Sequence, residues 1–245
     1  AENRLEPVGP KTGWDNKAVA ALVGKYRQRV DALMEEVIGE AETDLDGKYV
    51  RLRETNLGNL IADILRRTTG ADAALINGGG IRMSVLRGPV KVSDIYAVTP
   101  FDNYIVAIRL TGRQIRDALE HGVSGVEDEE GRFPQVSGLA FTYNPSGPRR
   151  SRVREILIGG RPLVDDREYT VATNDFLAAG GDGYKAFGDA IRSSQDYAVF
   201  GGAMQGEKLV YNDAGRWLRD VVIDFVKATK HLTPVVEGRI SEVGY

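Results

Sequence analysis

Cysteine is absent from this chain of 245 residues, and histidine occurs only twice, at His121 and His231. Without cysteine the chain can form no disulfide, thiolate zinc site or iron–sulfur cluster, and no cysteine can act as a nucleophile. Two histidines far apart in the sequence also argue against a histidine-rich metal centre. We therefore expect neither a metal-ligand set nor a cofactor in this chain.

Long basic runs and long apolar runs are also lacking. The net charge is −3, from 32 basic and 35 acidic residues, whereas binding a nucleic-acid backbone requires a clustered positive face. No stretch of about 18 apolar residues occurs, so we expect no membrane span. Residues 1–4 contain no signal segment, and we expect the chain to begin after processing or to have been cut from a longer one.

The chain does carry enough apolar sequence, 42% of its residues, to build a core without a metal or a disulfide. Its length corresponds to one large or two small domains. Apolar residues recur at helical spacing from Val19 to Val37, which predicts a long surface or linking helix ended by Gly39. A second helix is expected from Asn56, whose side chain would cap it, to Gly70.

Short apolar runs separated by turn residues predict a mixed α/β fold with short connections for the rest of the chain. Strands are expected at residues 73–76, 104–110, 139–143, 152–158 and 169–173. Helices are expected to open at Thr111 and, with Asp213 as cap, to run from about Asp213 to Thr229. The acidic stretch 122–134 is interpreted as a solvated loop.

A glycine-rich turn follows the predicted strand 73–76, at the kind of position where open α/β sheets bind ligands. It reads Asn77-Gly-Gly-Gly-Ile-Arg82. Three glycines let the backbone approach a ligand closely and expose its amides, and Arg82 offers a planar guanidinium to a phosphate or carboxylate. The run lacks the spacing of a Walker loop or a dinucleotide fingerprint, and by itself it also fits a tight structural turn.

Three further segments offer groups that suit a nucleotide. Glycines around Asp182 leave its carboxylate room to accept hydrogen bonds from a vicinal diol, although Asp182 could instead cap the next helix. Phe101 lies in a polar turn, where it either stacks on a flat ligand or folds back onto the core. Arg51 and Arg53 precede a predicted helix, where anions are favoured, and strand alternation would point both the same way.

Together the ordered motifs resemble the C-terminal, substrate-binding domain of the 5′-nucleotidase and UDP-sugar hydrolase family. They are Arg51-x-Arg-Glu-x-Asn-x-Gly-Asn-Leu, Asn77-Gly-Gly-Gly-Ile-Arg82, Pro100-Phe101 and Asn174-x-Phe176-Leu-Ala-x-Gly-Gly-Asp182-Gly, and the resemblance runs from about residue 17 to residue 240. It implies mixed β-sheets layered with helices and preceded by a long linking helix. Residues 1–40 would form an N-terminal linker segment and interdomain helix, and residues 41–245 the substrate-binding domain.

The resemblance also implies the roles of individual residues. Phe101 and Phe176 would sandwich the base, and Asp182 would hold the ribose hydroxyls. The remaining implied contacts are Asn77 and Gly80 to the nucleoside, and Arg51 and Arg82 to the phosphate. No catalytic residue and no metal ligand of the family is implied within this chain.

In this family an N-terminal metallophosphoesterase domain of the same polypeptide holds two divalent metal ions. Two scattered histidines cannot replace that set of ligands, so we expect nucleotide hydrolysis to require that domain and not to occur on this chain alone. A periplasmic, cell-wall or extracellular location is implied by the resemblance.

Several alternatives stay open at this point. The chain could be a stand-alone nucleotide-binding module, or the corresponding domain of a UDP-sugar or cyclic-nucleotide hydrolase. An esterase that uses Ser84 or Ser137 is disfavoured, because the Gly-x-Ser-x-Gly motif is missing.

Overall fold

The computed structural model describes residues 16–244, which belong to two compact units, residues 1–36 and 37–245. The first unit contains helix α1 (Lys17–Met34), whose N-terminus is capped by the Asn16 side chain. No side chain of α1 is buried among the described residues. The part of the predicted linker segment that comprises residues 1–15 lies outside the described residues.

Helix α1 ends earlier than the sequence predicts. Its last residue is Met34, and the predicted terminator Gly39 lies in strand β1 (Val37–Ala41). The backbone of β1 pairs with two other strands, so it cannot continue a helix.

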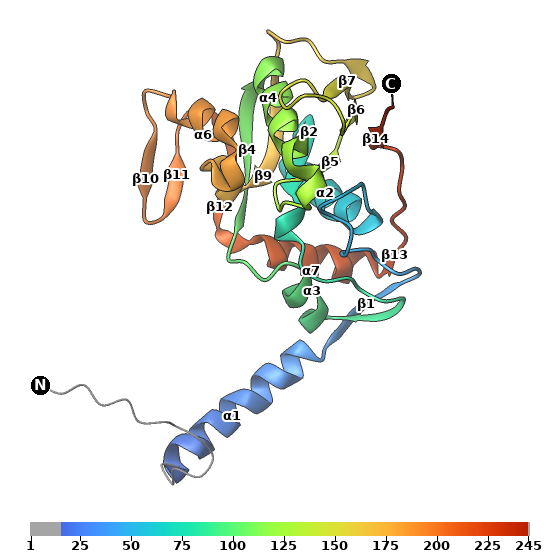
Figure 1. Cartoon of the computed structure of the whole chain (residues 1–245). Helices are drawn as coiled ribbons and strands as arrows, with labels where there is room; N and C mark the ends of the chain where they lie inside the picture. The colour runs from blue at the N-terminus through green and yellow to red at the C-terminus, as the bar shows by residue number, and fades with distance from the viewer. Residues whose placement is uncertain (1–15, 245) are drawn as a thin grey trace, which may run out of the picture. The chain divides into compact units, whose positions relative to one another are not determined.

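The second unit is a mixed α/β fold, as the sequence predicts (Figure 1). Its helices are α2 (Asn56–Thr69), α3 (Val92–Val98), α4 (Gly112–Gly122), α5 (Asp175–Ala178), α6 (Lys185–Arg192) and α7 (Leu218–Thr229), with 3₁₀ turns η1 (Gly78–Gly80), η2 (Val123–Asp128) and η3 (Gly181–Gly183). After β1, its strands are β2 (Ala73–Asn77), β3 (Gly88–Lys91), β4 (Tyr104–Thr111), β5 (Pro134–Ser137), β6 (Leu139–Tyr143), β7 (Val153–Ile158), β8 (Arg161–Pro162), β9 (Glu168–Asn174), β10 (Ala198–Phe200), β11 (Ala203–Gln205), β12 (Leu209–Trp217), β13 (His231–Leu232) and β14 (Ile240–Glu242).

A five-stranded sheet with the order β12-β4-β9-β2-β5 forms the centre of this unit. Only the β2–β9 pair in it is parallel. Smaller sheets have the orders β14-β6-β7-β8 and β13-β1-β3, and β10 with β11 forms a separate hairpin. Between residues 16 and 244, no helix combines the length and apolar content that a bilayer crossing requires.

Side chains that alternate along the central strands define the two faces of this sheet. In β4, the alternate residues from Tyr104 to Leu110 join the main core cluster, which also contains the apolar faces of α4 and α6. Helix α2 packs on β2, β5 and β9, and its buried residues lie outside that cluster. Both faces are therefore covered, which explains why β2 is buried at every position.

Helix α2 begins at Asn56, as predicted, but its N-cap residue is Thr55, and the predicted start of the last helix is wrong. The side-chain cap of α2 is Thr55, whose hydroxyl accepts from the Gly58 amide at 3.0 Å. The Asn56 side chain accepts from the amides of Asp46 and Leu57, each at 2.8 Å. The last helix begins at Leu218, because residues up to Trp217 pair with β4 as part of β12. Asp213 therefore lies in a strand and caps nothing.

The acidic stretch 122–134 is more ordered than a solvated loop. It forms η2 and the start of β5, and it buries Val123, Val126 and Phe133. Glu127 of this stretch makes an ion pair with the buried side chain of Arg152. Arg152 itself lies just before β7, which begins at Val153 and not at residue 152 as predicted.

Candidate functional site

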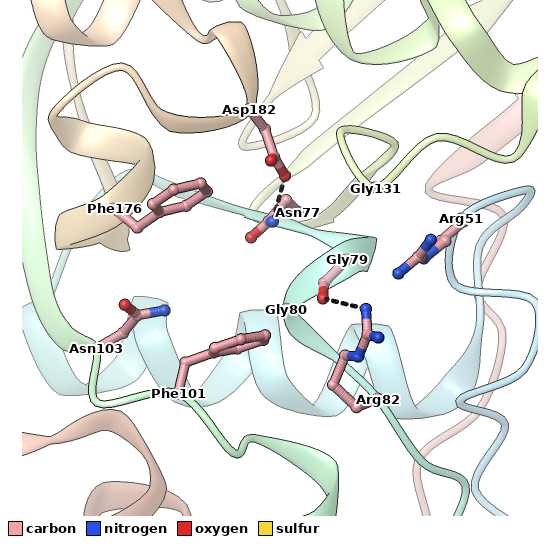
Figure 2. A pocket seen from close by; sticks show the side chains of 10 residues that line it. All are labelled: Arg51, Asn77, Gly79, Gly80, Arg82, Phe101, Asn103, Gly131, Phe176 and Asp182. Atoms are coloured by element: carbon pink, nitrogen blue, oxygen red, sulfur yellow. Dashed lines mark hydrogen bonds between the residues drawn. The ribbon is translucent and has the colours of Figure 1, made fainter. Parts of the chain in front are cut away.

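A cavity of about 260 Å³ opens where several loops meet at one edge of the central sheet (Figure 2). All seven residues to which the resemblance assigns ligand contacts line it, together with Gly79, Asn103 and Gly131: the seven are Arg51, Asn77, Gly80, Arg82, Phe101, Phe176 and Asp182. The loops that follow β2 and β9 and the turn that precedes β4 supply most of the lining. The sheet thus brings together groups that are far apart in the sequence.

The two phenylalanines project into this cavity from different loops, Phe176 from α5 and Phe101 from the turn before β4 (Figure 2). Phe101 is 47% exposed and Phe176 is 43% exposed, so neither ring folds back onto the core. Large apolar rings exposed in a polar turn are available to stack on a flat ligand.

Asp182 sits in η3 with a left-handed backbone, φ 49° and ψ 17°. Its carboxylate accepts a hydrogen bond of 2.6 Å from the Asn77 side chain at the end of β2. Helix α6 has Tyr184 at its N-cap position and no side-chain cap, so the alternative role of Asp182 as a helix cap is wrong. The carboxylate instead faces the cavity (Figure 2).

Contacts from both sides hold the Asp182 turn in place. His121 Nε2 lies 2.8 Å from the Asp182 backbone oxygen. A carbonyl oxygen can only accept, so Nε2 must carry the proton in this bond. A Cβ at Gly181 would lie 2.6 Å from the Phe176 ring, so glycine at this position lets the Phe176 ring and the Asp182 turn pack closely.

The glycines that follow β2 serve close packing more than amide exposure. The amides of Gly78 and Gly79 donate to the carbonyls of Phe133 at 2.7 Å and Gly131 at 2.8 Å. A Cβ on Gly78 would lie 2.1 Å from the Val50 carbonyl oxygen. The predicted availability of these two amides to a ligand is therefore wrong, since they fasten one loop of the pocket to another.

Arg51 and Arg82 line the end of the cavity away from the phenylalanines (Figure 2). Among residues 16–244, neither guanidinium pairs with a carboxylate, and Arg82 donates only a long bond of 3.4 Å to the Gly79 carbonyl. Unpaired guanidinium groups suit a phosphate, which they can bind through two parallel hydrogen bonds.

Arg51 and Arg53 do not point the same way, because residues 50–52 form a turn and not a strand. Arg53 lies over the Tyr49 ring, 4.7 Å from its centroid, and pairs with Asp46. Only Arg51 of the two reaches the cavity.

Asn103 also lines the cavity, although the sequence motifs do not predict it as a site residue. Its side-chain amide lies between the two phenylalanines in the view of Figure 2. An amide offers both a donor and an acceptor, which suits the edge of a base. Asn103 lies two residues after Phe101, in the same turn before β4. This proximity to a predicted site residue was the signal by which Asn103 could have been predicted.

Burial affects one acid beside the cavity. Desolvation raises the pKa of Asp175, although backbone hydrogen bonds from Tyr104, Phe176 and its own amide act against the rise. The Asp175 carboxylate accepts from the Tyr104 amide at 3.1 Å. It thereby joins the start of β4, three residues after Phe101, to α5, which contains Phe176.

Neither serine considered for an esterase has a histidine partner. Ser84 accepts from the Gly47 amide, and Ser137 donates to Asp63. The hydrogen bonds of His121 and His231 run to Asp182 and Glu42, respectively. No serine–histidine pair for nucleophilic catalysis exists in the part of the chain that the structure describes.

Fold and site define an α/β domain in which one cavity combines aromatic rings, a carboxylate and guanidinium groups. The family model for the 5′-nucleotidase C-terminal domain matches residues 37–189, starting where the second compact unit starts. The chain belongs to this family, as its motifs predict.

Relatives share the same region. The chain is 35% identical over 240 residues to the trifunctional nucleotide phosphoesterase protein YfkN of Bacillus subtilis. This match covers 94% of this chain and 15% of YfkN. The chain is also 32% identical over 172 residues to protein UshA of Escherichia coli, in a match that covers 69% of this chain and 30% of UshA. A crystal structure of a 5′-nucleotidase precursor from Thermus thermophilus matches with a TM-score of 0.76 at 39% identity, over 93% of this chain and 43% of that one. The chain thus spans less than half the length of each relative.

Proposed function

We propose that this domain recognises nucleosides and nucleotides for a 5′-nucleotidase-type phosphohydrolase. The observation that carries the proposal is the meeting of Phe101, Phe176 and Asp182 in one cavity. The base would lie between the rings, with Asn103 at its edge, and the carboxylate of Asp182 would accept from the ribose hydroxyls. Asn77 and Gly80 would contact the nucleoside.

Arg51 and Arg82 would bind the phosphate at the far end of the cavity. A phosphate there would be attracted by two guanidinium groups that no carboxylate among residues 16–244 pairs, while Asp182 would lie among the nucleoside contacts. This separation of charge would fix the direction in which a nucleotide lies. Holding the base and ribose in one place converts binding into orientation of the scissile bond, which is how such a domain raises a reaction rate.

The second part of this proposal concerns hydrolysis, which would take place in the whole enzyme. An N-terminal metallophosphoesterase domain of the same polypeptide would contain two divalent metal ions, which activate water and stabilise the charge on the phosphoryl group. The residues of the present cavity include one carboxylate and no histidine, so they would bind substrate without cleaving it. We place the enzyme in the periplasm, cell wall or extracellular space on family resemblance.

Titration calorimetry with adenosine and AMP tests the proposal on the chain described here. Stacking of a base on an aromatic side chain contributes about 1–3 kcal/mol, so Phe176→Ala and Phe101→Ala should each weaken binding by roughly 5- to 150-fold. Phe200→Ala is the matched control, since Phe200 is 78% exposed on the β10–β11 hairpin and lines no part of the cavity. Unchanged affinity in both pocket variants would refute the base sandwich.

A further inference from the structure

Two carboxylates and an imidazole meet at the β1–β13 ladder, outside the cavity described above. Glu40 and His231 are partners in the parallel register of the two strands. Glu42 follows two residues after Glu40, and alternation along the extended chain places it on the same face. The ligand-capable atoms of the three side chains all lie within 4.8 Å of one another.

Backbone hydrogen bonds hold this arrangement. The Glu40 amide donates to the Lys230 carbonyl at 2.7 Å, and the Glu42 amide donates to the Leu232 carbonyl at 3.0 Å. These bonds flank His231 on both sides, so the relative positions of the three residues follow from the ladder and not from flexible loops. Ala41, between the two glutamates, is fully buried and anchors the strand.

The charges in this cluster are not balanced by the protein. His231 Nδ1 lies 2.8 Å from a Glu42 carboxylate oxygen. Among residues 16–244 neither Glu40 nor Glu42 pairs with a lysine or arginine. The contact with His231 engages the carboxylate of Glu42 only. The carboxylate of Glu40 lies beside it, and the two negative charges repel each other. A divalent cation would relieve this repulsion.

The donor set indicates which cation fits. Imidazole suits zinc and other first-row transition metals, whereas magnesium and calcium prefer oxygen ligands alone. Glutamate oxygens and one histidine nitrogen are also ligands that zinc takes, with water completing a four-coordinate site. All three side chains are exposed, so an ion can enter from solvent and keep a bound water.

We propose that Glu40, Glu42 and His231 form a binding site for a divalent transition-metal ion of the zinc type. The ion would join β1 to β13. Strand β1 begins at Val37, directly after the unit that contains α1. The ion would therefore hold β1, the first strand of the second unit, in place against β13.

Calorimetric titration of the chain with zinc chloride, in a buffer that does not coordinate zinc, tests this site. We expect one zinc ion per chain, and removing a ligand in His231→Ala or Glu42→Gln should weaken binding by roughly tenfold or more. Glu155→Gln is the matched control, because Glu155 is an exposed carboxylate on β7 that lies outside the cluster. Its affinity for zinc should equal that of the unmodified chain.

A parallel titration with cobalt gives a readout of the ligands themselves, since bound cobalt absorbs visible light according to its coordination. The cobalt spectrum should change in His231→Gln, which keeps a polar side chain at this exposed position. Three outcomes would each overturn the proposal. They are the same zinc affinity in all variants, zinc binding that is no tighter than magnesium binding, and no binding at about 1 mM zinc.

Discussion

Gly181 decides how closely the Asp182 turn approaches Phe176. A Cβ at Gly181 would lie 2.6 Å from two ring atoms of Phe176 and from its backbone oxygen, and the backbone oxygen cannot move aside easily. We expect Gly181→Ala to cost about 1–3 kcal/mol of stability through overpacking and to weaken nucleoside binding by displacing ring and carboxylate together.

Urea unfolding and adenosine titration measure the two effects of Gly181→Ala. Gly215→Ala is the control, because no atom lies within 4 Å of a Cβ at Gly215. If Gly181→Ala binds adenosine as the unmodified chain does, the close packing of the turn is not required for recognition.

The sequence predicts which residues line the cavity better than it predicts their conformations. Phe101 stands in a polar turn, which marks it as unusual before any coordinates are considered, and Phe176 is expected from the family resemblance. Nothing local shows that the Gly78 and Gly79 amides bond to residues 131 and 133, about fifty positions away. The Glu40, Glu42 and His231 cluster is hidden for the same reason, because a strand ladder forms it across the length of the domain.

At the scale of elements, the cap of α2 gives a prediction that separates two neighbouring residues. The Thr55 hydroxyl satisfies the Gly58 amide, one of the free amides of the first turn. Thr55→Ala should therefore lower the free energy of unfolding by about 0.5–2 kcal/mol, while Thr55→Ser, which keeps the hydroxyl, should cost less. Urea denaturation of both variants checks this, and equal losses in both would show that the methyl group matters and the cap does not.

A continuous β-rich run is predicted nearly to the residue, whereas a strand that depends on its pairing partner is not. The run 104–110 is continuous and β-rich, and β4 spans Tyr104–Thr111. Strand β12 carries Asn212, Asp213 and Gly215, residues typical of turns, and exists because β4 offers a partner edge. The sequence therefore places a helix cap at Asp213, where pairing with β4 makes a strand.

For the whole molecule, two ion pairs give a dependence of stability on pH. Hydrogen bonds from Arg152 lower the pKa of Glu127 to about 2. Burial acts to raise the pKa of Asp63, but hydrogen bonds from Arg239 and Ser137 and the charge of Arg239 outweigh it, so this pKa is lowered. Arg239 contacts both oxygens of Asp63, at 2.8 and 3.0 Å.

Both carboxylates take up protons less readily in the folded chain than in the unfolded chain. Their stabilisation is therefore present above the ordinary carboxyl pKa of about 4 and is lost as the pH falls towards 2. Glu127 is 47% exposed, and solvent screening limits its share to about 1 kcal/mol or less. Urea denaturation between pH 6 and pH 2.5 should show a shallower decline in Asp63→Asn than in the unmodified chain, and parallel declines would exclude Asp63 as a source.

Asp182 lies at a different part of the cavity from Arg51 and Arg82, and this has a consequence for the proposed binding of nucleotides. A nucleotide turned end for end would put its phosphate beside a carboxylate and its sugar beside bare guanidinium groups, so that pose is disfavoured twice. Molecules of different base or phosphate count would all lie in the same sense, with their anionic ends emerging on one side of the domain.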